Sequence, residues 1–380
     1  MSAFKSIINT MLSLIKNPKF MLISLVPWNE KRQKTQDNLD EAKSLVTTFG
    51  GRVSVVIAQN AARADKSTYI GKGKAHELAN VVADKSIDVA VINDNLKSSQ
   101  LYTLKSIFEK LKPEIFVWDR TDLILQIFEK NASTAEAKLQ IKLANTRHKG
   151  PELYGMGLTM SQQGGGIGTR GVGETNSEIM RRHWRSEINS IEKQLKKLTA
   201  SRQRQMENRR ETSIPTISII GYTNSGKTTL FNLMSKKHNL TKDSLFATLD
   251  SSVGKFYLPK VGRVVYITDT IGFIQNLPAE TVNAFKSTLM ETLNANLLLH
   301  IIDIYDHLML NKIAVVEEVL SSLGIDTKKQ LYVFNKIDRP NLVTKSELTQ
   351  RFASFKPQFI SAKSGEGYPQ LVDAIQKELF

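Results

Sequence analysis

A glycine-rich turn between an apolar run and a helical pattern is the part of the sequence best suited to chemistry. It matches G-x-x-x-x-G-K-[ST] at residues 221–228, with TISII before it and TLFNLMSK after it. In such a loop, backbone N–H groups and the helix amino terminus bind phosphates, the lysine neutralises the β- and γ-phosphates, and the last hydroxyl ligates Mg²⁺. The predicted contacts are Gly221, Tyr222, Thr223, Asn224, Ser225, Gly226, Lys227, Thr228 and Thr229.

A second motif, DTIG at residues 269–272, follows the apolar run VVYIT. A carboxylate at a strand end across the site is suited to hold Mg²⁺ through water, and a glycine leaves its N–H free to meet the γ-phosphate. We therefore expect contacts from Asp269, Thr270, Ile271 and Gly272. Thr228 and Asp269 are predicted metal ligands, and Lys227 and Gly272 are predicted catalytic residues.

Two further motifs predict which base is bound. NKID at residues 335–338 follows the run QLYVF, and SAK at residues 361–363 follows the next strand pattern. The carboxylate of Asp338 can accept hydrogen bonds from N1–H and N2–H₂ of guanine, whereas adenine would leave it unpaired, a difference worth ~10⁴–10⁵-fold. Guanine contacts are expected from Asn335, Lys336, Asp338, Ser361, Ala362 and Lys363. Together the four motifs predict GTP and GDP as substrate and product, with Mg²⁺ as cofactor.

The pattern around these motifs predicts an α/β fold. In residues 20–120, short apolar runs at 20–26, 52–58, 87–92 and 114–119 alternate with helical patterns at 36–49, 73–85 and 98–111. Such alternation is typical of βαβ units and a parallel sheet. It resumes in residues 212–380, where strands are expected at 216–220, 253–258, 263–268, 297–302, 330–334 and 357–360. We expect this second domain to be a P-loop domain with a doubly wound sheet.

The region between the two α/β domains predicts a helical hairpin over residues 121–211. One long helix is expected at 121–147 and another at 177–210, joined by a glycine-rich loop over 155–175 that contains eight glycines. Residues 1–19 have apolar side chains at helical spacing, which favours an extension helix packed on its own domain; a membrane-surface helix is the alternative.

Composition narrows the classes of function. The chain has 380 residues and no cysteine, which excludes disulfides and cysteine-ligated metals, and its six histidines show no ligand spacing. No run reaches the ~20 apolar residues of a membrane span. Lys and Arg exceed Asp and Glu by 34 − 22 = 12 in residues 1–211, but only by 18 − 15 = 3 in residues 212–380. The basic excess of the first part favours a polyanion partner bound there.

Several runs, some of them outside the generic nucleotide motifs, resemble the HflX family of ribosome-associated GTPases. The resemblance covers roughly residues 20–380. The matching runs are YIGKGK (69–74), EAKLQIKLA (136–144), GGGIGTRGVGETNSE (164–178), GYTNSGKTTLFN (221–232), LFATLD (245–250), DTIGFIQNLP (269–278), AFKSTL (284–289) and NKID (335–338).

The resemblance implies roles that spacing alone does not reveal. Thr248 would be the switch threonine that closes on Mg²⁺ and the γ-phosphate, with Phe246 and Ala247 beside it at the nucleotide. The partners would be the 50S subunit and the 70S ribosome, contacted through 23S rRNA, with no DNA partner. The glycine-rich loop, with Arg170 as its one cation, would reach the catalytic centre of the large subunit. The expected protein is a cytoplasmic monomer that splits stalled or idle 70S ribosomes under stress.

One departure from GTPases at large bears on the rate of hydrolysis. Phe273 follows Gly272, where many small GTPases have a glutamine that orients the attacking water. An apolar side chain cannot orient water, so we expect slow hydrolysis by the chain alone and stimulation by its partner.

Other functions remain open on the sequence alone. A ribosome-assembly GTPase, a membrane-surface signalling module and a scaffold that binds GTP without hydrolysis are the alternatives. The run GKGK at residues 71–74 is at most a weak second nucleotide site.

Overall fold

The computed structural model contains two compact units. It describes residues 15–28, 32–163, 176–211, 214–237, 245–246, 252–270, 272–274, 292, 294–325, 329–339 and 344–380. One unit comprises Met1–Lys130 and Ile141–Glu192, and the other Asn131–Gln140 and Lys193–Phe380. The predicted extension helix of residues 1–19 falls mostly outside the described residues, as does the predicted loop from residue 164 to 175.

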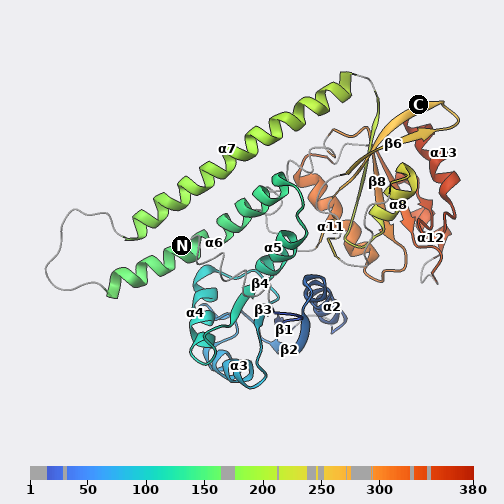
Figure 1. Ribbon diagram of the computed structural model, residues 1–380. Coiled ribbons are helices and arrows are strands. Elements are labelled where there is room, and N and C mark those ends of the chain that lie inside the picture. Colours follow the sequence, from blue (N-terminus) through green and yellow to red (C-terminus); the bar gives the residue numbers. More distant parts are fainter. Residues whose placement is uncertain are drawn as a thin grey trace. The chain divides into compact units, whose positions relative to one another are not determined.

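The first unit contains a four-stranded parallel sheet with the strand order β2-β1-β3-β4, as expected for this part of the chain. Four helices accompany the strands (Figure 1). The elements are β1 (Lys19–Val26), α2 (Arg32–Phe49), β2 (Arg52–Asn60), α3 (Lys72–Asp84), β3 (Val89–Ile92), α4 (Ser98–Glu109), β4 (Phe116–Asp119) and α5 (Arg120–Asn131).

The position of each strand in this sheet explains its residue pattern. The central strand β3 is buried along its whole length, and β1 is buried along most of it, because helices cover both faces. The edge strand β2 instead alternates between exposed and half-buried residues. An apolar core containing Met21, Leu78, Ile92 and Phe108 fills one face of the sheet.

The helical hairpin differs from the sequence prediction in two ways. The expected helix at 121–147 is two helices, because α5 ends at Asn131 and α6 (Ala135–Gln163) begins after a short break. Helix α6 then continues through Gly150, Gly155 and Gly157, so the first nine residues of the expected loop at 155–175 are helical. At Gly150 the glycine serves packing, because a Cβ there would lie 2.4 Å from the ring of Trp184.

The second long helix, α7 (Asn176–Glu211), is antiparallel to α6. Lys142 of α6 forms an ion pair with Glu187, whereas Thr146, one turn later, accepts a hydrogen bond from Trp184 Nε1 at 2.7 Å. Figure 1 shows α7 running back alongside α6 in the opposite direction. Trp184 is therefore a packing residue between the two helices.

The second unit contains a six-stranded sheet with the order β10-β9-β8-β5-β7-β6. All pairs are parallel except β6–β7, which form a hairpin because only four residues separate them. Its elements are β5 (Thr216–Gly221), α8 (Lys227–Ser235), β6 (Ser252–Leu258), β7 (Arg263–Asp269), β8 (Leu297–Asp303), α11 (Met309–Ser322), β9 (Gln330–Asn335), α12 (Lys345–Arg351), the 3₁₀ turn η1 (Ala353–Phe355), β10 (Gln358–Phe359) and α13 (Tyr368–Leu379).

Strand β5, the first of this sheet along the chain, lies in the interior of the sheet between β8 and β7. The chain passes through α8 to β6 and β7 on one side of β5, and then crosses to β8 on the other. Open α/β sheets bind ligands at the carboxyl ends of strands where the winding reverses in this way. The glycine-rich loop of residues 221–226 begins at the carboxyl end of β5.

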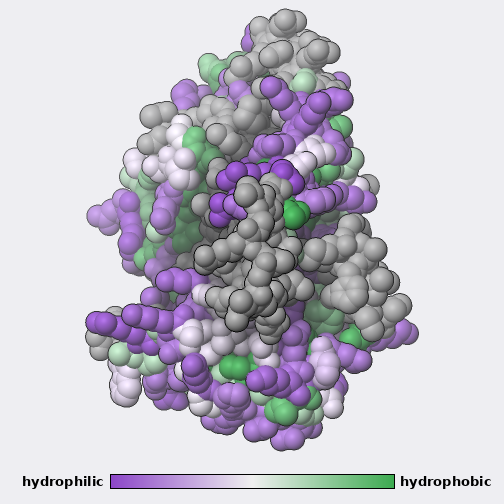
Figure 2. Space-filling model, turned by 90° about the vertical axis from the view of Figure 1, so that its left-hand side faces the viewer, coloured by the Kyte–Doolittle hydropathy of each residue, from purple (hydrophilic) through white to green (hydrophobic). Residues whose placement is uncertain are grey.

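The surface of the described residues is mainly polar on the face drawn in Figure 2, where hydrophobic side chains occur in small separate groups. None of the described helices combines the length and the apolar character needed to cross a bilayer.

Candidate nucleotide-binding site

The loop after β5 requires glycine at both of its ends. Gly221 has φ 145°, and a Cβ there would lie 2.3 Å from the carbonyl oxygen of Ile301. Gly226 has φ 96°, and a Cβ there would lie 2.1 Å from Nδ2 of Asn335. Neither position has room for a larger residue, and Gly226 directly precedes the first residue of α8. Backbone N–H groups of this loop and helix are thereby placed to bind an anion.

Lys227 is buried within this loop, and burial disfavours its charged form. Its ammonium group donates to the carbonyl oxygen of Tyr222 at 2.7 Å, and the residue is only 6% exposed. Burial lowers the pKa of Lys227 to about 8, which the charge of Asp269 opposes and that of Lys336 reinforces. A phosphate group bound beside the ammonium would favour the charged form and reverse this shift.

Two hydroxyl groups of the loop lack partners among the described residues. Thr223 Oγ1 and Ser225 Oγ are both buried, and neither has a hydrogen-bond partner. A buried polar group without a partner costs about 1–3 kcal/mol. A ligand with several acceptor oxygens, such as a polyphosphate, would satisfy both hydroxyls.

The two predicted metal ligands with described structure are in contact. Thr228 Oγ1, in the first turn of α8, donates to Asp269 Oδ2 at 2.8 Å, and Asp269 is fully buried at the end of β7. A hydroxyl and a carboxylate are hard oxygen ligands of the kind that Mg²⁺ prefers. These residues therefore fit the magnesium ion that the sequence predicts.

Asn335, at the end of β9, connects two loops of the site. Its Nδ2 donates to the carbonyl oxygen of Ser225 at 2.8 Å, and its Oδ1 accepts from the backbone N–H of Ala362 at 2.9 Å. One buried amide thus fixes the phosphate loop and the SAK loop relative to each other.

Lys336 continues this connection, and the sequence analysis missed one of its partners. Its ammonium donates to the carbonyl oxygen of Asn224 at 2.9 Å and pairs with Asp303 Oδ2 at 2.6 Å. Asp303 is the last residue of β8. A lone carboxylate at a strand end carries no motif, although its position between two motif-bearing strands could have indicated it.

Asp338 is exposed, so its carboxylate is accessible to a ligand. A hydrogen bond from the Ser361 side chain lowers the pKa of Asp338. Burial opposes this shift, but a backbone hydrogen bond and the charges of Arg339 and Lys363 lower the pKa further. The carboxylate is thus ionised at neutral pH and able to accept two hydrogen bonds. Ser361 is itself buried in the SAK loop.

Gly272 and Phe273 extend the sheet across the phosphate loop. The Phe273 N–H donates to Gly221 O at 3.1 Å, and the Thr223 N–H donates to Phe273 O at 2.8 Å. A Cβ at Gly272 would lie 2.9 Å from Nζ of Lys227. The Phe273 side chain is 2% exposed, which makes it part of the protein interior.

The site therefore assembles the four motifs at the carboxyl ends of β5, β7 and β9 and in the loop after β10. The structure does not describe three predicted residues, Ala247, Thr248 and Ile271. Phe246 is described, and its side chain is buried.

Three family models match consecutive parts of the chain between residues 36 and 336. A model described as GTP-binding GTPase N-terminal matches residues 36–129, one described as GTP-binding GTPase Middle Region matches residues 131–209, and one described as 50S ribosome-binding GTPase matches residues 216–336. The GTPase HflX of Caldanaerobacter subterraneus is 42% identical over 91% of this chain and 78% of its own length. The Escherichia coli GTPase HflX is 37% identical over 92% and 80%. The chain belongs to the HflX family of GTPases.

Solved structures of similar fold agree with the architecture. A crystal structure of SsGBP with GDP aligns with a TM-score of 0.55 at 24% identity, covering 95% of this chain and 98% of the other. A GTP-binding protein of Sulfolobus solfataricus with GDP aligns at 0.50 and 22%, covering 95% and 98%. The HflX-family chain is thus a GTP-hydrolysing enzyme with a P-loop GTPase domain.

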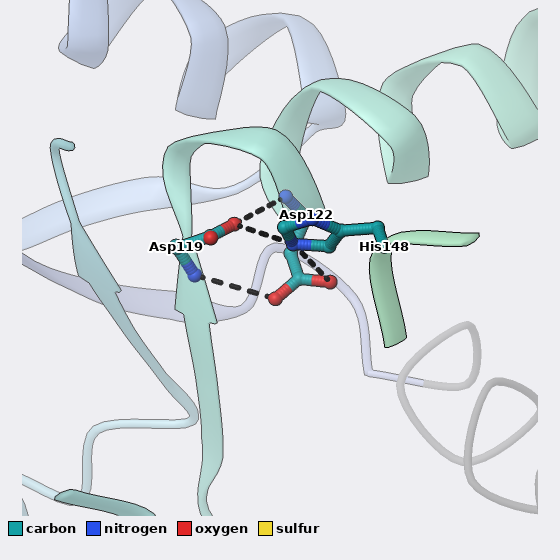
Figure 3. Close-up of side chains that lie close together, drawn as sticks. All are labelled: Asp119, Asp122 and His148. Carbon is teal, nitrogen blue, oxygen red and sulfur yellow. Dashed lines mark hydrogen bonds and ion pairs between the residues drawn. The ribbon is translucent and has the colours of Figure 1, made fainter. Parts of the chain in front are cut away.

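The HflX-family GTPase also holds a polar cluster in its first unit that the sequence analysis missed (Figure 3). His148 Nε2 of α6 lies 3.2 Å from Asp119 Oδ1 and 3.9 Å from Asp122 Oδ1. The two aspartates also bond each other's backbone N–H groups, which caps the start of α5. The capping pattern D-x-x-D is visible in the sequence, but its distant histidine partner is not.

This cluster has the residue types of a metal site, but two basic side chains, His148 and Lys149, already lie against its carboxylates. Burial lowers the pKa of His148, but the hydrogen bond and charge of Asp119, together with the charge of Asp122, raise it by more, so the net pKa lies above the usual value. Lys149 Nζ adds a second cation 3.6 Å from Asp122 Oδ1. We therefore interpret the cluster as an ion-pair group that joins β4, α5 and α6.

Proposed function

We propose that this HflX-family GTPase binds the large ribosomal subunit when GTP is bound and splits 70S ribosomes. The carrying observation is the exposed basic face of α7. Within residues 178–200, every cationic side chain is exposed: Arg181, Arg182, Arg185, Lys193, Lys196 and Lys197. Two of the three acids in this stretch, Glu187 and Glu192, pair with Lys142 and Arg147 of α6. A row of exposed cations suits contact with RNA phosphates.

The nucleotide site provides the control of docking. In the proposal Thr228, Asp269 and Thr248 would hold Mg²⁺, which would help to neutralise the charge of the phosphates. The γ-phosphate then orders Thr248 and the segment of residues 269–277, and hydrolysis releases them. Lys227 stabilises the phosphate charge, and water is the nucleophile.

The buried Phe273 supports a slow basal reaction. With its side chain in the protein interior, this position offers nothing to orient the attacking water. We propose that the ribosome completes the site, so that phosphate release by the chain alone is slow and rises strongly when ribosomes are added. Fast release that ribosomes leave unchanged would contradict this part of the proposal.

The proposal is tested by co-sedimentation with 50S subunits in a non-hydrolysable GTP analogue. The double variant Lys196→Gln/Lys197→Gln should bind several-fold more weakly at physiological salt. Its affinity should also depend less on salt, so that the magnitude of the negative slope of log affinity against log salt decreases by about one to two. The matched control is Lys345→Gln/Lys377→Gln, which removes two exposed lysines of the GTPase domain and should bind normally. Equal losses in both variants would show a non-specific charge effect.

Sucrose gradients separate splitting from assembly. Added protein with GTP should convert 70S ribosomes into subunits. If 70S ribosomes stay intact while the protein sediments with large-subunit precursors, the assembly alternative is correct. Deletion of residues 164–174, the glycine-rich loop with Arg170, should abolish splitting.

A further inference from the structure

A lysine from outside the nucleotide motifs contacts the phosphate loop. Lys312, in the first turn of α11, places its ammonium 4.8 Å from the centre of the Tyr222 ring. Tyr222 is the second residue of the loop and is buried. A cation this close to the face of an aromatic ring is attracted by the π electrons of the ring, and more strongly where water is excluded. Lys312 therefore holds one side chain of the phosphate loop.

Asp306 fixes Lys312 in this position. A lysine in the first turn of a helix is disfavoured by the positive end of the helix dipole. Here the ammonium of Lys312 forms an ion pair with Oδ2 of Asp306. Oδ1 of the same carboxylate accepts the backbone N–H of Leu308 at 2.9 Å, just before α11 begins. Lys312 is thus held between a fixed carboxylate and the ring of Tyr222.

The turn that contains Asp306 supports a second lysine at the same loop. The backbone N–H of Asp306 donates to the carbonyl oxygen of Asp303 at 3.3 Å. Asp303 pairs with Lys336, whose ammonium donates to the carbonyl oxygen of Asn224. Two aspartates of one turn therefore hold two lysines against the phosphate loop, at its second and fourth residues.

The backbone of Tyr222 contacts the lysine that is predicted to bind the phosphates. Its carbonyl oxygen accepts from Lys227 Nζ at 2.7 Å and from the backbone N–H of Ser225 at 3.4 Å. Because the ring of Tyr222 is held, its backbone can adopt fewer conformations, and the direction of this carbonyl is restricted. If the ring is released, the loop also samples conformations that cannot bind phosphates. The apparent affinity for the nucleotide then falls with the fraction of molecules that can still bind.

We propose that Lys312 is a positioning residue that keeps the phosphate loop in its nucleotide-binding conformation by holding the ring of Tyr222. The inference rests on the assignment of residues 221–228 as the loop that binds the phosphates. The contact involves neither the base nor the γ-phosphate. GDP and GTP should therefore depend on Lys312 to the same extent.

The test measures equilibrium affinities of the full chain, with Mg²⁺, for fluorescent GDP and for a non-hydrolysable GTP analogue. Lys312→Met keeps an unbranched apolar side chain but removes the charge. It should weaken binding of both nucleotides by the same factor, about two- to tenfold, the range for one cation–π contact. Lys312→Arg keeps a cation that can lie over the ring, so it should retain most of the wild-type affinity. A side chain that served only to fill space would not show this difference between methionine and arginine.

A matched control and a double variant show whether the effect runs through the ring. Lys345 is another exposed lysine of the same unit that lies over an aromatic ring, 6.0 Å from the centre of Phe359. Lys345→Met should change neither affinity. Tyr222→Leu removes the ring, so Lys312→Met should have no further effect in that background.

Three results would overturn the inference: unchanged affinities in Lys312→Met, an equal loss in Lys345→Met, or a loss from Lys312→Met that persists in the Tyr222→Leu background. Lys227→Ala tests the site assignment separately. If Lys227→Ala leaves nucleotide affinity unchanged, residues 221–228 are not the phosphate loop, and the site assignment and the inference are both wrong. If Lys227→Ala abolishes binding while Lys312→Met changes nothing, only the inference is wrong.

Discussion

The two sheets in this protein carry polar residues at the carboxyl ends of parallel strands, and the two sets of residues differ in how far the protein itself supplies their partners. At the first sheet, the charges are paired within the protein: the guanidinium of Arg120 pairs with Glu41 and donates to Asn93 Oδ1 at 2.7 Å, although its Nε has no hydrogen-bond partner, and His148 pairs with Asp119. At the second sheet, the hydroxyls of Thr223 and Ser225 lack partners, and Lys227 is buried with a lowered pKa.

The contrast separates a structural cluster from a ligand site more clearly than residue type does. Both regions contain buried charges at strand ends, and the first even has the residue types of a metal site. A structural cluster satisfies its own charges, so breaking it lowers stability. A ligand site keeps groups that only the ligand can satisfy, so breaking it lowers affinity and leaves stability nearly unchanged. Each prediction that follows tests one side of this contrast.

The largest effect is expected from Lys227→Ala. Loss of the ammonium group should abolish GTP binding, a loss of at least about a thousandfold. The free energy of unfolding should stay within about 1 kcal/mol of wild type, because the lysine pays a desolvation cost in the ligand-free protein. Nucleotide titration and urea denaturation measure the two quantities, and a large drop in stability would place Lys227 with the structural groups.

Asp338→Asn should change which base is bound. An amide can donate to O2 of xanthine and accept from its N1–H, but it cannot accept both guanine donors. The preference for GTP over XTP should fall by at least about a hundredfold and can reverse, since buried polar mismatches cost several kcal/mol. Competition titrations with both nucleotides measure the ratio. Unaltered GTP selectivity would show that this carboxylate does not read the base.

Arg120→Ala should lower stability and leave GTP affinity unchanged, the opposite of what is expected for Lys227→Ala. The change removes Arg120 as the partner of the poorly solvated Glu41 carboxylate, and breaking such a buried pair costs about 3 kcal/mol. The urea midpoint of the first unit should fall, while the folded protein keeps its GTP affinity. The double variant Arg120→Met/Glu41→Leu should recover much of the stability, because it removes both charges. A loss of GTP affinity without a loss of stability would show that Arg120 serves ligand binding and not stability.

The smallest effect is a pH dependence from His148. Since the folded-state pKa of His148 is raised above its unfolded value of about 6.5, its contribution to stability is complete below that value. The contribution is lost as the pH rises through the folded-state pKa. The stability advantage of wild type over His148→Gln should therefore be larger at pH 6 than at pH 9, as measured by urea denaturation. An advantage that grew with pH would contradict the assigned ion pair.

The sequence predicted most of the architecture because its signals are local. Apolar runs and helical patterns located both parallel sheets, and the four motifs located the nucleotide site. The same local logic went wrong at Gly150 and Gly155, which look like helix breakers but lie within α6. Glycine is needed at position 150 because the ring of Trp184 packs against it. Trp184 is distant in the sequence, so no local pattern reveals this contact.

The parts of the site that the sequence did not predict depend on contacts between distant residues. Asp303 pairs with Lys336, and His148 pairs with Asp119, across 33 and 29 residues. The hydrogen bond from Asn131 Nδ2 to the carbonyl oxygen of Phe246 crosses 115 residues. None of these partners lies in a recognisable motif, because their role is to hold other residues rather than to contact a ligand.

The helices α6 and α7 are held face to face by the ion pair of Lys142 with Glu187 and by the hydrogen bond from Trp184 to Thr146. A helix advances by about 100° per residue. Adding or deleting a single residue between these contacts would therefore turn the residues that follow off the face that packs against the other helix, and only changes of about seven residues would restore the phase. Natural variation in the length of α6 and α7 should therefore be confined to the ends away from the contacts of Trp184.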